Sequence, residues 1–468
     1  MKTELLSPAG SLKAMRYAYA YGADAVYAGQ PRYSLRVRNN EFSTLDSLKG
    51  GIDEAHALGK KFYLAANIAP HNAKVKTFLN DIKPVIELNP DALIMSDPGL
   101  IMMVREHFPD MPVHLSVQAN VVNYAGVKFW HRQGIERVIL SRELSLDEIE
   151  EIRMQCPEME LEVFVHGALC IAYSGRCLLS GYFNKRDPNQ GTCTNACRWK
   201  YQLHDAKETE TGDIIATDIE EQEAQDPVTV VDPAAGQQAQ PDTFEPHVDG
   251  LEDQTFLLQE GSRPGEYMPI YEDEHGTYIM NSRDLRAIQH VERLVKMGIH
   301  SLKIEGRTKS PYYAARTAQA YRKAIDDAEA GKSFDMGLMD ELESLASRGY
   351  TEGFYRRHVH DQYQRYESGN SMTGSQQLVG EIMSVDDGKM KVDVKNKFNV
   401  GDHLEVVKPS GNVSFDLTEM INKKGEAVDS APGSGHVMDI PLPEGVEANE
   451  ELDEFGMIVR YLPEQRYT

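Results

Sequence analysis

The first 170 residues alternate short apolar runs with longer amphipathic runs. Seven strand-like runs occur there, and an eighth follows much later in the chain. They cover residues 4–6, 25–28, 62–66, 92–96, 113–117, 137–141, 161–166 and 301–305. Short apolar strands that alternate with helical patterns are typical of βα units, so the pattern predicts a parallel sheet.

Capping signals mark the starts of several of the intervening helices. Ser11 precedes a helical pattern that reaches Gly22. Ser145 and the glutamate three residues later form a capping box, and Ser310 precedes a proline suited to a first helical turn. Eight such units predict a closed (β/α)8 barrel, with an open doubly wound sheet as the alternative. No glycine-rich phosphate motif follows the first strand, which argues against a dinucleotide-binding fold.

The seventh unit carries a long insertion between its strand and the eighth strand. Its own helix is expected only at 283–297. Fifteen acidic residues and one lysine fall between positions 205 and 253, so this segment supplies 14 of the 24 net negative charges. Such a composition offers little for a core, and we expect residues 205–254 to form a flexible acidic insertion.

The pattern changes again toward the end of the chain. Short β-like runs appear at 378–382, 390–394 and 403–407, and turn signals such as Asp387-Gly388 separate them. We therefore expect a small β-barrel domain over 376–468 and a linker over 351–375. The (β/α)8 barrel would occupy 1–350, with a cysteine-cluster region at 166–200.

No apolar run is long enough for a transmembrane helix. The first residues include Glu4 and Pro8 in place of the apolar core of a signal peptide, so we expect a cytoplasmic protein without membrane contact. The acidic insertion concentrates the negative charge, and basic residues gather with aromatic ones at 32–38, 185–200 and 303–323. These clusters suit RNA phosphates and bases, although solvated helix faces would look the same.

Four of the five cysteines lie close together in the seventh unit. Their spacing is Cys170-x6-Cys177-x15-Cys193-x3-Cys197. Four thiolates suit either zinc or an iron–sulfur cluster. Structural zinc sites commonly contain two close C-x2-C pairs, which are missing here, so a four-iron cluster is favoured; zinc or unligated cysteines remain alternatives. Cys156 stands apart and is expected to be a small buried side chain.

Polar residues follow the predicted strands at their carboxyl ends, where (β/α)8 barrels form their active sites. They are Asn67, Asp97, Gln118, Arg142, Glu143, His166, Glu305 and Arg307. Such side chains can line a pocket for a small anion, or they can cap the following helix. Among them we take His166, Arg307 and Arg142 as candidate catalytic residues.

The stretch EVFVHGALCIAYSGRCLLS at 162–180 is similar to the signature of the collagenase-like peptidase family. The similarity extends through RDPNQGTCTNACRW at 186–199, SLKIEGRTK at 301–309 and NKFNVGD at 396–402. It covers nearly the whole chain except the acidic insertion. The family has long been grouped with peptidases of unknown mechanism.

This resemblance implies a specific chemistry. The four clustered cysteines would bind a [4Fe-4S] cluster, and the reaction would be hydroxylation of the wobble uridine of tRNA to 5-hydroxyuridine. Prephenate, a dicarboxylate, would be a required co-substrate. Arginine pairs with a carboxylate through two parallel hydrogen bonds, so Arg307 and then Arg142 are the candidates to bind it, with tRNA phosphate as the alternative ligand.

Other functions remain open at this point. Relatives that act on ribosomal RNA make another RNA a possible substrate. A peptidase fits the family's older name, but the sequence has no His-Glu-x-x-His motif and no Gly-x-Ser-x-Gly motif. A third alternative is a non-catalytic RNA-binding or assembly protein stabilised by zinc.

Overall fold

The computed structural model describes residues 2–34, 40–68, 70–167, 284–306, 310–343, 345, 350–356 and 376–462 in full. Between 168 and 283 it describes only the backbone of short strands. The chain divides into two compact units. One contains Met1–Leu169, Arg283–Tyr363 and Met372–Thr468, and the other contains Cys170–Ser282 and Gln364–Ser371.

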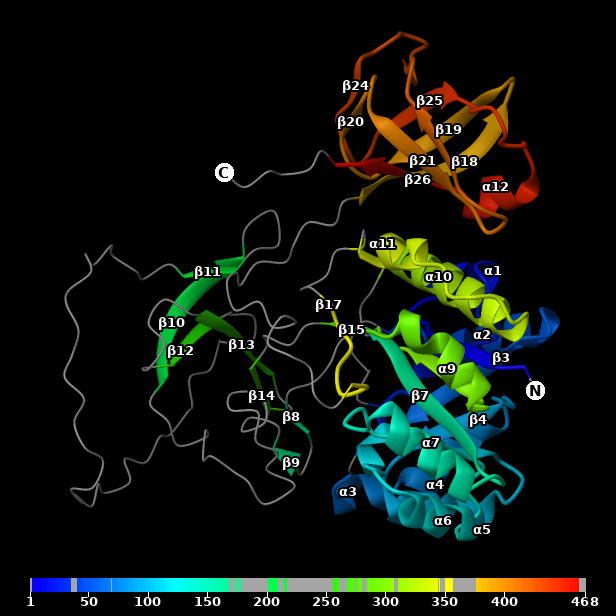
Figure 1. The fold of residues 1–468 in the computed structure, drawn as a ribbon, viewed down its shortest axis with the longest axis vertical. Helices are drawn as coiled ribbons and strands as arrows, with labels where there is room; N and C mark the ends of the chain where they lie inside the picture. The colour runs from blue at the N-terminus through cyan, green and yellow to red at the C-terminus, as the bar shows by residue number, and fades with distance from the viewer. Residues whose placement is uncertain are drawn as a thin grey trace. The chain divides into compact units, whose positions relative to one another are not determined.

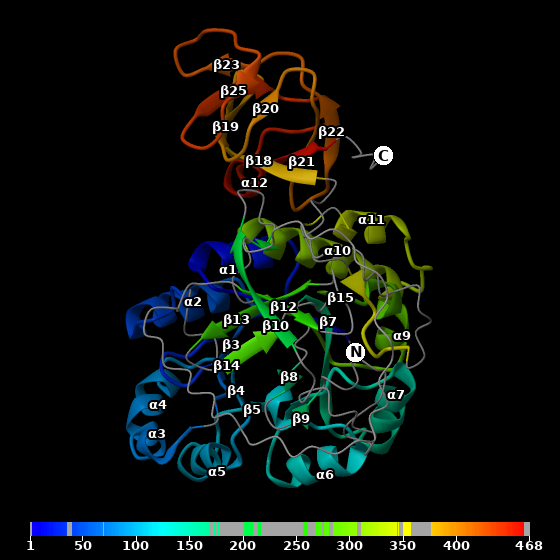
Figure 2. The same cartoon turned by 90° about the vertical axis from the view of Figure 1, so that its left-hand side faces the viewer.

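A closed barrel of eight parallel strands forms the centre of the first unit (Figures 1 and 2). The barrel closes because the last strand pairs in parallel with both the first and the seventh. This confirms the predicted (β/α)8 barrel and excludes the open sheet. The strands are β1 (Glu4–Pro8), β2 (Ala25–Gly29), β3 (Lys61–Ala66), β4 (Ala92–Met95), β5 (Val113–Leu115), β6 (Arg137–Ile139), β7 (Glu160–Gly167) and β16 (Ser301–Ile304).

Helices surround these strands, and the predicted caps are confirmed. Ser11 accepts a hydrogen bond from the amide of Ala14, Ser145 and Glu148 form the capping box, and Ser310 accepts from the amide of Tyr313. The helices are α1 (Leu12–Ala20), α2 (Leu45–Ala57), α3 (Asn72–Val75), α4 (Phe78–Ile86), α5 (Pro98–His107), α6 (Tyr124–Arg132), α7 (Leu146–Gln155), α9 (Val291–Lys296), α10 (Pro311–Glu329) and α11 (Gly337–Glu343). Among the described residues, no helix combines the length and apolar character needed to cross a membrane.

The helix predicted at 283–297 is wrong in its first half. The strand β15 (Asp284–Arg286) and the 3-10 helix η4 (Ile288–His290) occupy that half. β15 runs antiparallel to β7, with Leu285 opposite Gly167 and Arg286 opposite His166. The short strand β17 (Tyr350–Thr351) then pairs with β15. The chain therefore leaves the barrel at the carboxyl end of β7 and returns beside the same strand end, so both ends of the 168–283 insertion are fixed there.

The second unit contains strands whose backbone alone is described. An antiparallel sheet has the order β11-β10-β12-β13-β14, and β8 (Ala172–Tyr173) pairs with β9 (Arg176–Cys177). Its strands are β10 (Tyr201–Glu208), β11 (Ile214–Ala216), β12 (Phe256–Glu260), β13 (Tyr267–Asp273) and β14 (Gly276–Ile279). The sequence did not predict this sheet. Most of the acidic insertion, from 217 to 254, lies outside the described residues.

The C-terminal region is a separate antiparallel β domain, as predicted. Its main sheet has the order β22-β21-β26-β18-β19-β25-β23 and surrounds its own apolar cluster, which includes Val392, Phe398 and Ile458. Asp387 and Gly388 both have positive φ at the β18–β19 turn. The elements are β18 (Gln376–Asp386), β19 (Lys389–Val394), β20 (Phe398–Asn399), β21 (His403–Val407), β22 (Val413–Asp416), β23 (Ile421–Asn422), β24 (Ser430–Ala431), β25 (Val437–Pro441), α12 (Glu450–Phe455) and β26 (Met457–Tyr461).

The lumen of the barrel contains ion pairs in place of a wholly apolar filling. The Arg137 guanidinium contacts Glu4 at 2.6 Å and Glu162 at 3.2 Å, and the Lys303 ammonium contacts Glu162 at 2.9 Å. Tyr63 donates a hydrogen bond of 2.8 Å to Glu4. Because buried charges are costly unless they are paired, these contacts tie β1, β6, β7 and β16 to one register.

Replacing Arg137 with methionine should destabilise the barrel strongly, because buried Glu4 and Glu162 would lose a counter-charge. We expect a loss of about 3–5 kcal/mol in the free energy of unfolding, measured by urea denaturation. Arg16→Met is the matched control, since Arg16 is 45% exposed and pairs with Glu54 on the surface. It should cost under about 1 kcal/mol. Equal losses in the two variants would show that the buried network does not stabilise the fold.

Candidate active site at the carboxyl end of the barrel

Arg142 and Glu305 form an ion pair where β6 and β16 end. The Arg142 Nη2 atom lies 3.0 Å from the Glu305 Oε2 atom, and the two side chains are 17% and 9% exposed. The Arg142 guanidinium also lies 3.8 Å from the centre of the Phe164 ring, which belongs to β7. Three strand ends therefore contribute to one arrangement, in which an arginine is held against an aromatic face.

The backbone of Glu305 is held on both sides. Its amide donates to the His166 carbonyl at 2.8 Å, and its carbonyl accepts from the Tyr313 hydroxyl at 2.9 Å. Tyr313 belongs to α10 and is buried. Burial raises the pKa of Tyr313 well above its ordinary value, so its hydroxyl stays protonated and donates at neutral pH. The side chain of Glu305 is thus kept close to Arg142.

Gly167 is required at the point where β7 ends. Its φ is +99°, and a Cβ atom there would lie 2.2 Å from the carbonyl oxygen of Glu305. Any larger residue would have to push β7 and β16 apart. The glycine therefore allows the chain to leave the barrel directly beside Glu305, three residues before Cys170.

His166 lies next to this arrangement, but its ring is fully buried. It is surrounded by the rings of Tyr313, Tyr321 and Tyr350, with centres 5.4–5.8 Å away. The Tyr321 hydroxyl lies 3.4 Å from Nδ1 of His166. These contacts suit a residue that fixes the end of β7 against α10. Its catalytic role stays a prediction.

The remaining polar residues at the strand ends have one of two expected roles: they make polar contacts at this end of the barrel, or they cap a helix. Asn67 donates to the Gln118 side chain at 3.0 Å, and Glu143 accepts from the Ser141 hydroxyl, so both belong to polar contacts at this end of the barrel. Asp97 instead caps α5 by accepting from the Leu100 amide at 2.8 Å. The capping alternative is therefore correct for Asp97.

Several predicted site residues lie outside what the structure describes. Arg307 and the side chains of the four clustered cysteines belong to this group, and for Cys177 only the backbone in β9 is described. Cys156 is fully buried, as expected, and ends α7. Among the described residues, no group of three or more His, Cys, Asp or Glu side chains could hold a metal ion.

Three of the basic residues in the cluster predicted at 303–323 are neutralised by acidic partners, whereas Arg307 and Lys309 lie outside the described residues. Lys303 lies in the barrel lumen, Arg316 is 2% exposed and lies 3.6 Å from Glu405, and Arg322 pairs with Asp24 at 2.9 Å. Tyr33 of the first cluster is also buried, with its hydroxyl donated to Asp81 at 2.7 Å. These residues cannot serve as exposed phosphate contacts or base platforms in this conformation.

A smaller set of exposed basic residues does lie at this end of the barrel. Arg32 follows β2, is 56% exposed and pairs with Asp81 at 3.0 Å. The exposed residues His71, Lys74 and Lys76 lie in and around α3, which follows β3. The Lys74 ammonium donates to the Arg32 carbonyl at 3.1 Å, so the two loops are joined. The sequence did not single out the α3 residues, because the two lysines alternate with alanine and valine and form no continuous basic run.

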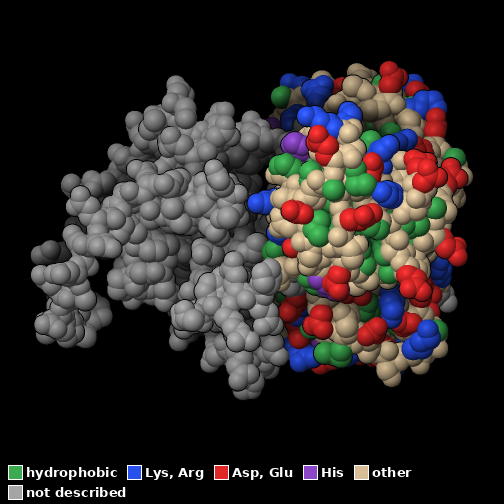
Figure 3. Space-filling model, turned by 90° about the horizontal axis from the view of Figure 1, so that it is seen from above, with side chains coloured by type: hydrophobic (Ala, Val, Ile, Leu, Met, Phe, Trp, Pro, Cys, Tyr) green, Lys and Arg blue, Asp and Glu red, His purple; other side chains and the backbone are tan. Residues whose placement is uncertain are grey.

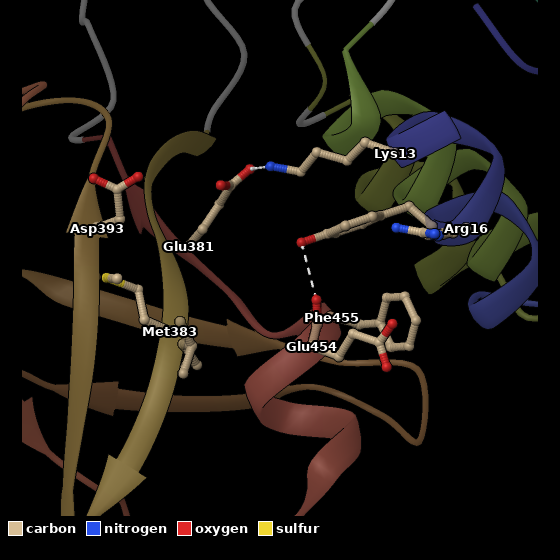
Figure 4. A pocket seen from close by; sticks show the side chains of 9 residues that line it. Lys13, Arg16, Glu381, Met383, Asp393, Glu454 and Phe455 are labelled. Carbon is tan, nitrogen blue, oxygen red and sulfur yellow. Dashed lines mark hydrogen bonds and ion pairs between the residues drawn. The ribbon is translucent and has the colours of Figure 1, made fainter. Parts of the chain in front are cut away.

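Elsewhere the described surface carries mixed charge. Acidic and basic side chains are interspersed on the face shown in Figure 3. A pocket of about 220 Å³ lies outside the barrel between α1 and the C-terminal domain (Figure 4). Both of its cations are already partnered: Lys13 binds Glu381 at 2.7 Å, and Arg16 binds Glu54 at 2.6 Å. This pocket uses none of the strand-end residues.

Gly167→Ala should disrupt the end of β7 through a direct steric clash as well as backbone strain. Gly59→Ala is the matched control, because Gly59 also has positive φ but a Cβ atom added to it would meet no other atom within 4 Å. We expect the control to lose about 1–2 kcal/mol of unfolding free energy and Gly167→Ala to lose clearly more, measured by urea denaturation. Similar losses would contradict the close packing of Gly167 on Glu305.

Comparison with known proteins places this geometry in a family. The family model described as peptidase family U32 matches residues 10–365, and the model of that family's C-terminal domain matches residues 374–450. The chain is 64% identical over 452 residues to tRNA hydroxylation protein P of Escherichia coli K12, covering 96% of each chain. It is 61% identical over 453 residues to tRNA hydroxylation protein P of Haemophilus influenzae, covering 96% of this chain and 95% of that one.

A more distant relative has a different name. The protein called collagenase in Porphyromonas gingivalis is 26% identical over 471 residues, covering 97% of each chain. The first family model covers most of the barrel, and the second covers most of the C-terminal domain. The chain belongs to peptidase family U32.

Proposed function

We propose that this protein is a tRNA-modifying enzyme that hydroxylates the wobble uridine of tRNA to 5-hydroxyuridine. The observation that carries the proposal is the identity of 64% and 61% to two proteins named for tRNA hydroxylation, which extends over nearly the whole of each chain. The proposed reaction centre is the carboxyl end of the barrel, and the proposed place of the reaction is the cytoplasm, where tRNA is found.

The proposed cofactor is a [4Fe-4S] cluster bound by Cys170, Cys177, Cys193 and Cys197. Four thiols provide a complete ligand set for such a cluster, and the fifth cysteine, Cys156, is buried in the barrel wall away from this set in the sequence. Hydroxylation exchanges a ring C–H for C–OH and removes two electrons from the base, so an oxygen-atom donor and a two-electron acceptor must enter the site from outside the protein. When bound, the cluster would supply electron transfer.

Chain connectivity joins the cysteine-containing segment to the carboxyl end of the barrel. Cys170 follows Gly167 by three residues, so covalent geometry alone keeps it within roughly 11 Å of the end of β7. The insertion that carries the cysteines also returns at β15, beside the same strand end. The four ligands therefore belong to a segment anchored twice at the carboxyl end of the barrel.

The proposed co-substrate is prephenate, whose carboxylates require cations at this end of the barrel. Arg142 suits this role because its guanidinium is held over the ring of Phe164 and remains partly exposed. Arg307 remains a second candidate from its position after β16. His166 would act through the fold, by holding the end of β7 against α10.

The proposed substrate is tRNA, and its phosphates need exposed cations near the same strand ends. Arg32, His71, Lys74 and Lys76 meet this requirement among the described residues. Hydroxylation of another RNA would use the same surface. Peptidase activity is the less favoured alternative, because the relatives at 64% and 61% identity are named for tRNA hydroxylation, whereas the relative named collagenase is 26% identical.

The proposed cluster predicts that the four ligand cysteines are needed for iron binding and tRNA hydroxylation and that Cys156 is not. Alanine at Cys170, Cys177, Cys193 or Cys197 should lower the iron content of anaerobically purified protein. It should also remove 5-hydroxyuridine from the tRNA of a strain that carries only the variant. Cys156→Ala is the control and should retain both. Iron content and tRNA nucleosides are measured by metal analysis and mass spectrometry; full iron retention in all four variants would reject the ligand assignment.

The salt dependence of tRNA binding distinguishes residues that contact tRNA phosphate from residues that contact the prephenate carboxylates. Lys74→Ala should weaken tRNA binding and flatten its logarithmic salt dependence by about one unit, because one phosphate contact is lost. Arg142→Met should leave that slope unchanged but raise the prephenate concentration needed for hydroxylation. Lys49→Ala, on the exposed surface of α2, is the control for charge alone. A flattened slope in Arg142→Met would reassign Arg142 to tRNA phosphate.

A further inference from the structure

We propose that Glu305 occupies the carboxylate-binding position of Arg142 when no ligand is bound, and that it competes with the incoming anion. This inference rests on the proposed function, since it assumes an anionic co-substrate at Arg142. In this structure the Glu305 carboxylate binds Arg142, and it must move away before the carboxylate of a free ligand can bind there. Glu305 would then set the affinity and the specificity of the site.

The Arg142–Glu305 pair differs in exposure from the ion pairs below it in the barrel. Arg137 and Lys303 are each 4% exposed, and their shared partner Glu162 is fully buried. Arg142 is 17% exposed and Glu305 is 9% exposed. Among these described pairs, the one at the carboxyl end is therefore the pair that an entering solute can reach.

The geometry of Arg142 suits exchange of one carboxylate for another. The Arg142 Cζ atom lies 3.8 Å from the centre of the Phe164 ring, so the guanidinium is held against an aromatic face. The Glu305 contact is made through the Nη2 atom. A free carboxylate can align with two parallel N–H groups of an arginine, which makes a stronger contact than a single one.

Glu305 cannot move far from Arg142, because its backbone is fixed. The hydrogen bonds to the His166 carbonyl and from the Tyr313 hydroxyl hold both sides of the residue, and Gly167 packs against its carbonyl. Only the side chain can rotate away. The competing carboxylate therefore stays at the site at a constant high local concentration, and any ligand must bind against it.

The same contact has a structural advantage in the empty protein. A largely buried arginine without a counter-charge would destabilise the fold. Glu305 supplies this counter-charge to Arg142 when no ligand is bound. Its presence lowers the affinity of the site for the anionic ligand. Removing the negative charge should consequently tighten ligand binding, which ordinary structural damage to a binding site does not do.

The test is calorimetric titration of prephenate into the anaerobically purified holoenzyme. Glu305→Gln removes the competing charge while keeping the side-chain size, and should lower the dissociation constant roughly tenfold, the size expected for losing a charge-assisted contact. Glu305→Asp shortens the side chain and should give a smaller decrease. Glu343→Gln is the matched control, because Glu343 is 59% exposed and pairs with a different arginine, Arg286, at 2.6 Å; it should have no effect.

Arg142→Met distinguishes the inference from the proposed function. If this variant loses prephenate binding while Glu305→Gln binds no more tightly than the wild type, Glu305 is not a competitor, but the assignment of Arg142 stands. If Arg142→Met binds prephenate normally, the proposed role of Arg142 fails as well. Should Glu305→Gln not fold, judged by its thermal transition, the aspartate variant decides, and unchanged or weaker binding in it overturns the inference.

Discussion

The buried ion network in the barrel lumen is the interaction on which the rest of the structure depends. Burial alone raises the pKa of the Glu4 carboxyl, but Arg137 and Lys61 outweigh it and hold that pKa below its usual range. Burial, together with the same cations and Lys303, lowers the pKa of His114, so this lumen histidine stays neutral. The charges therefore balance within the barrel, and they do so only when β1, β6, β7 and β16 keep their observed register.

That register places the candidate site. The Lys303–Glu162 pair aligns β16 with β7, so Phe164 and Glu305 come to the carboxyl end of the barrel at adjacent strands. The irregular pairing between Lys303 and Ile304 then shifts the last residues of β7, and Gly167 packs directly on Glu305. The chain enters the cysteine-containing insertion from this point and returns to it through β15. The ion pairs in the lumen thus also determine the position of the Arg142–Glu305 pair at the carboxyl end of the barrel.

The sequence predicted the strands, the caps and the C-terminal domain because these depend on local periodicity and on neighbouring residues. It failed where the partner is remote in the chain. Lys303, Arg316 and Arg322 resembled a basic surface, but Glu162, Glu405 and Asp24 neutralise them from distant segments. The β15 strand was missed because three residues carry too little pattern to predict a pairing. Glu305 was recognised only as a polar strand-end residue, since its contact with Arg142 joins positions 163 residues apart.

The most direct test of the proposed function is a reaction with purified components. The holoenzyme, isolated without air, is incubated with tRNA that lacks wobble hydroxylation and with a soluble two-electron acceptor, either with or without prephenate, and the tRNA nucleosides are analysed by mass spectrometry. We predict 5-hydroxyuridine at the wobble position only when prephenate is present. Unmodified tRNA under both conditions, from protein with a full complement of iron, would contradict the proposed function.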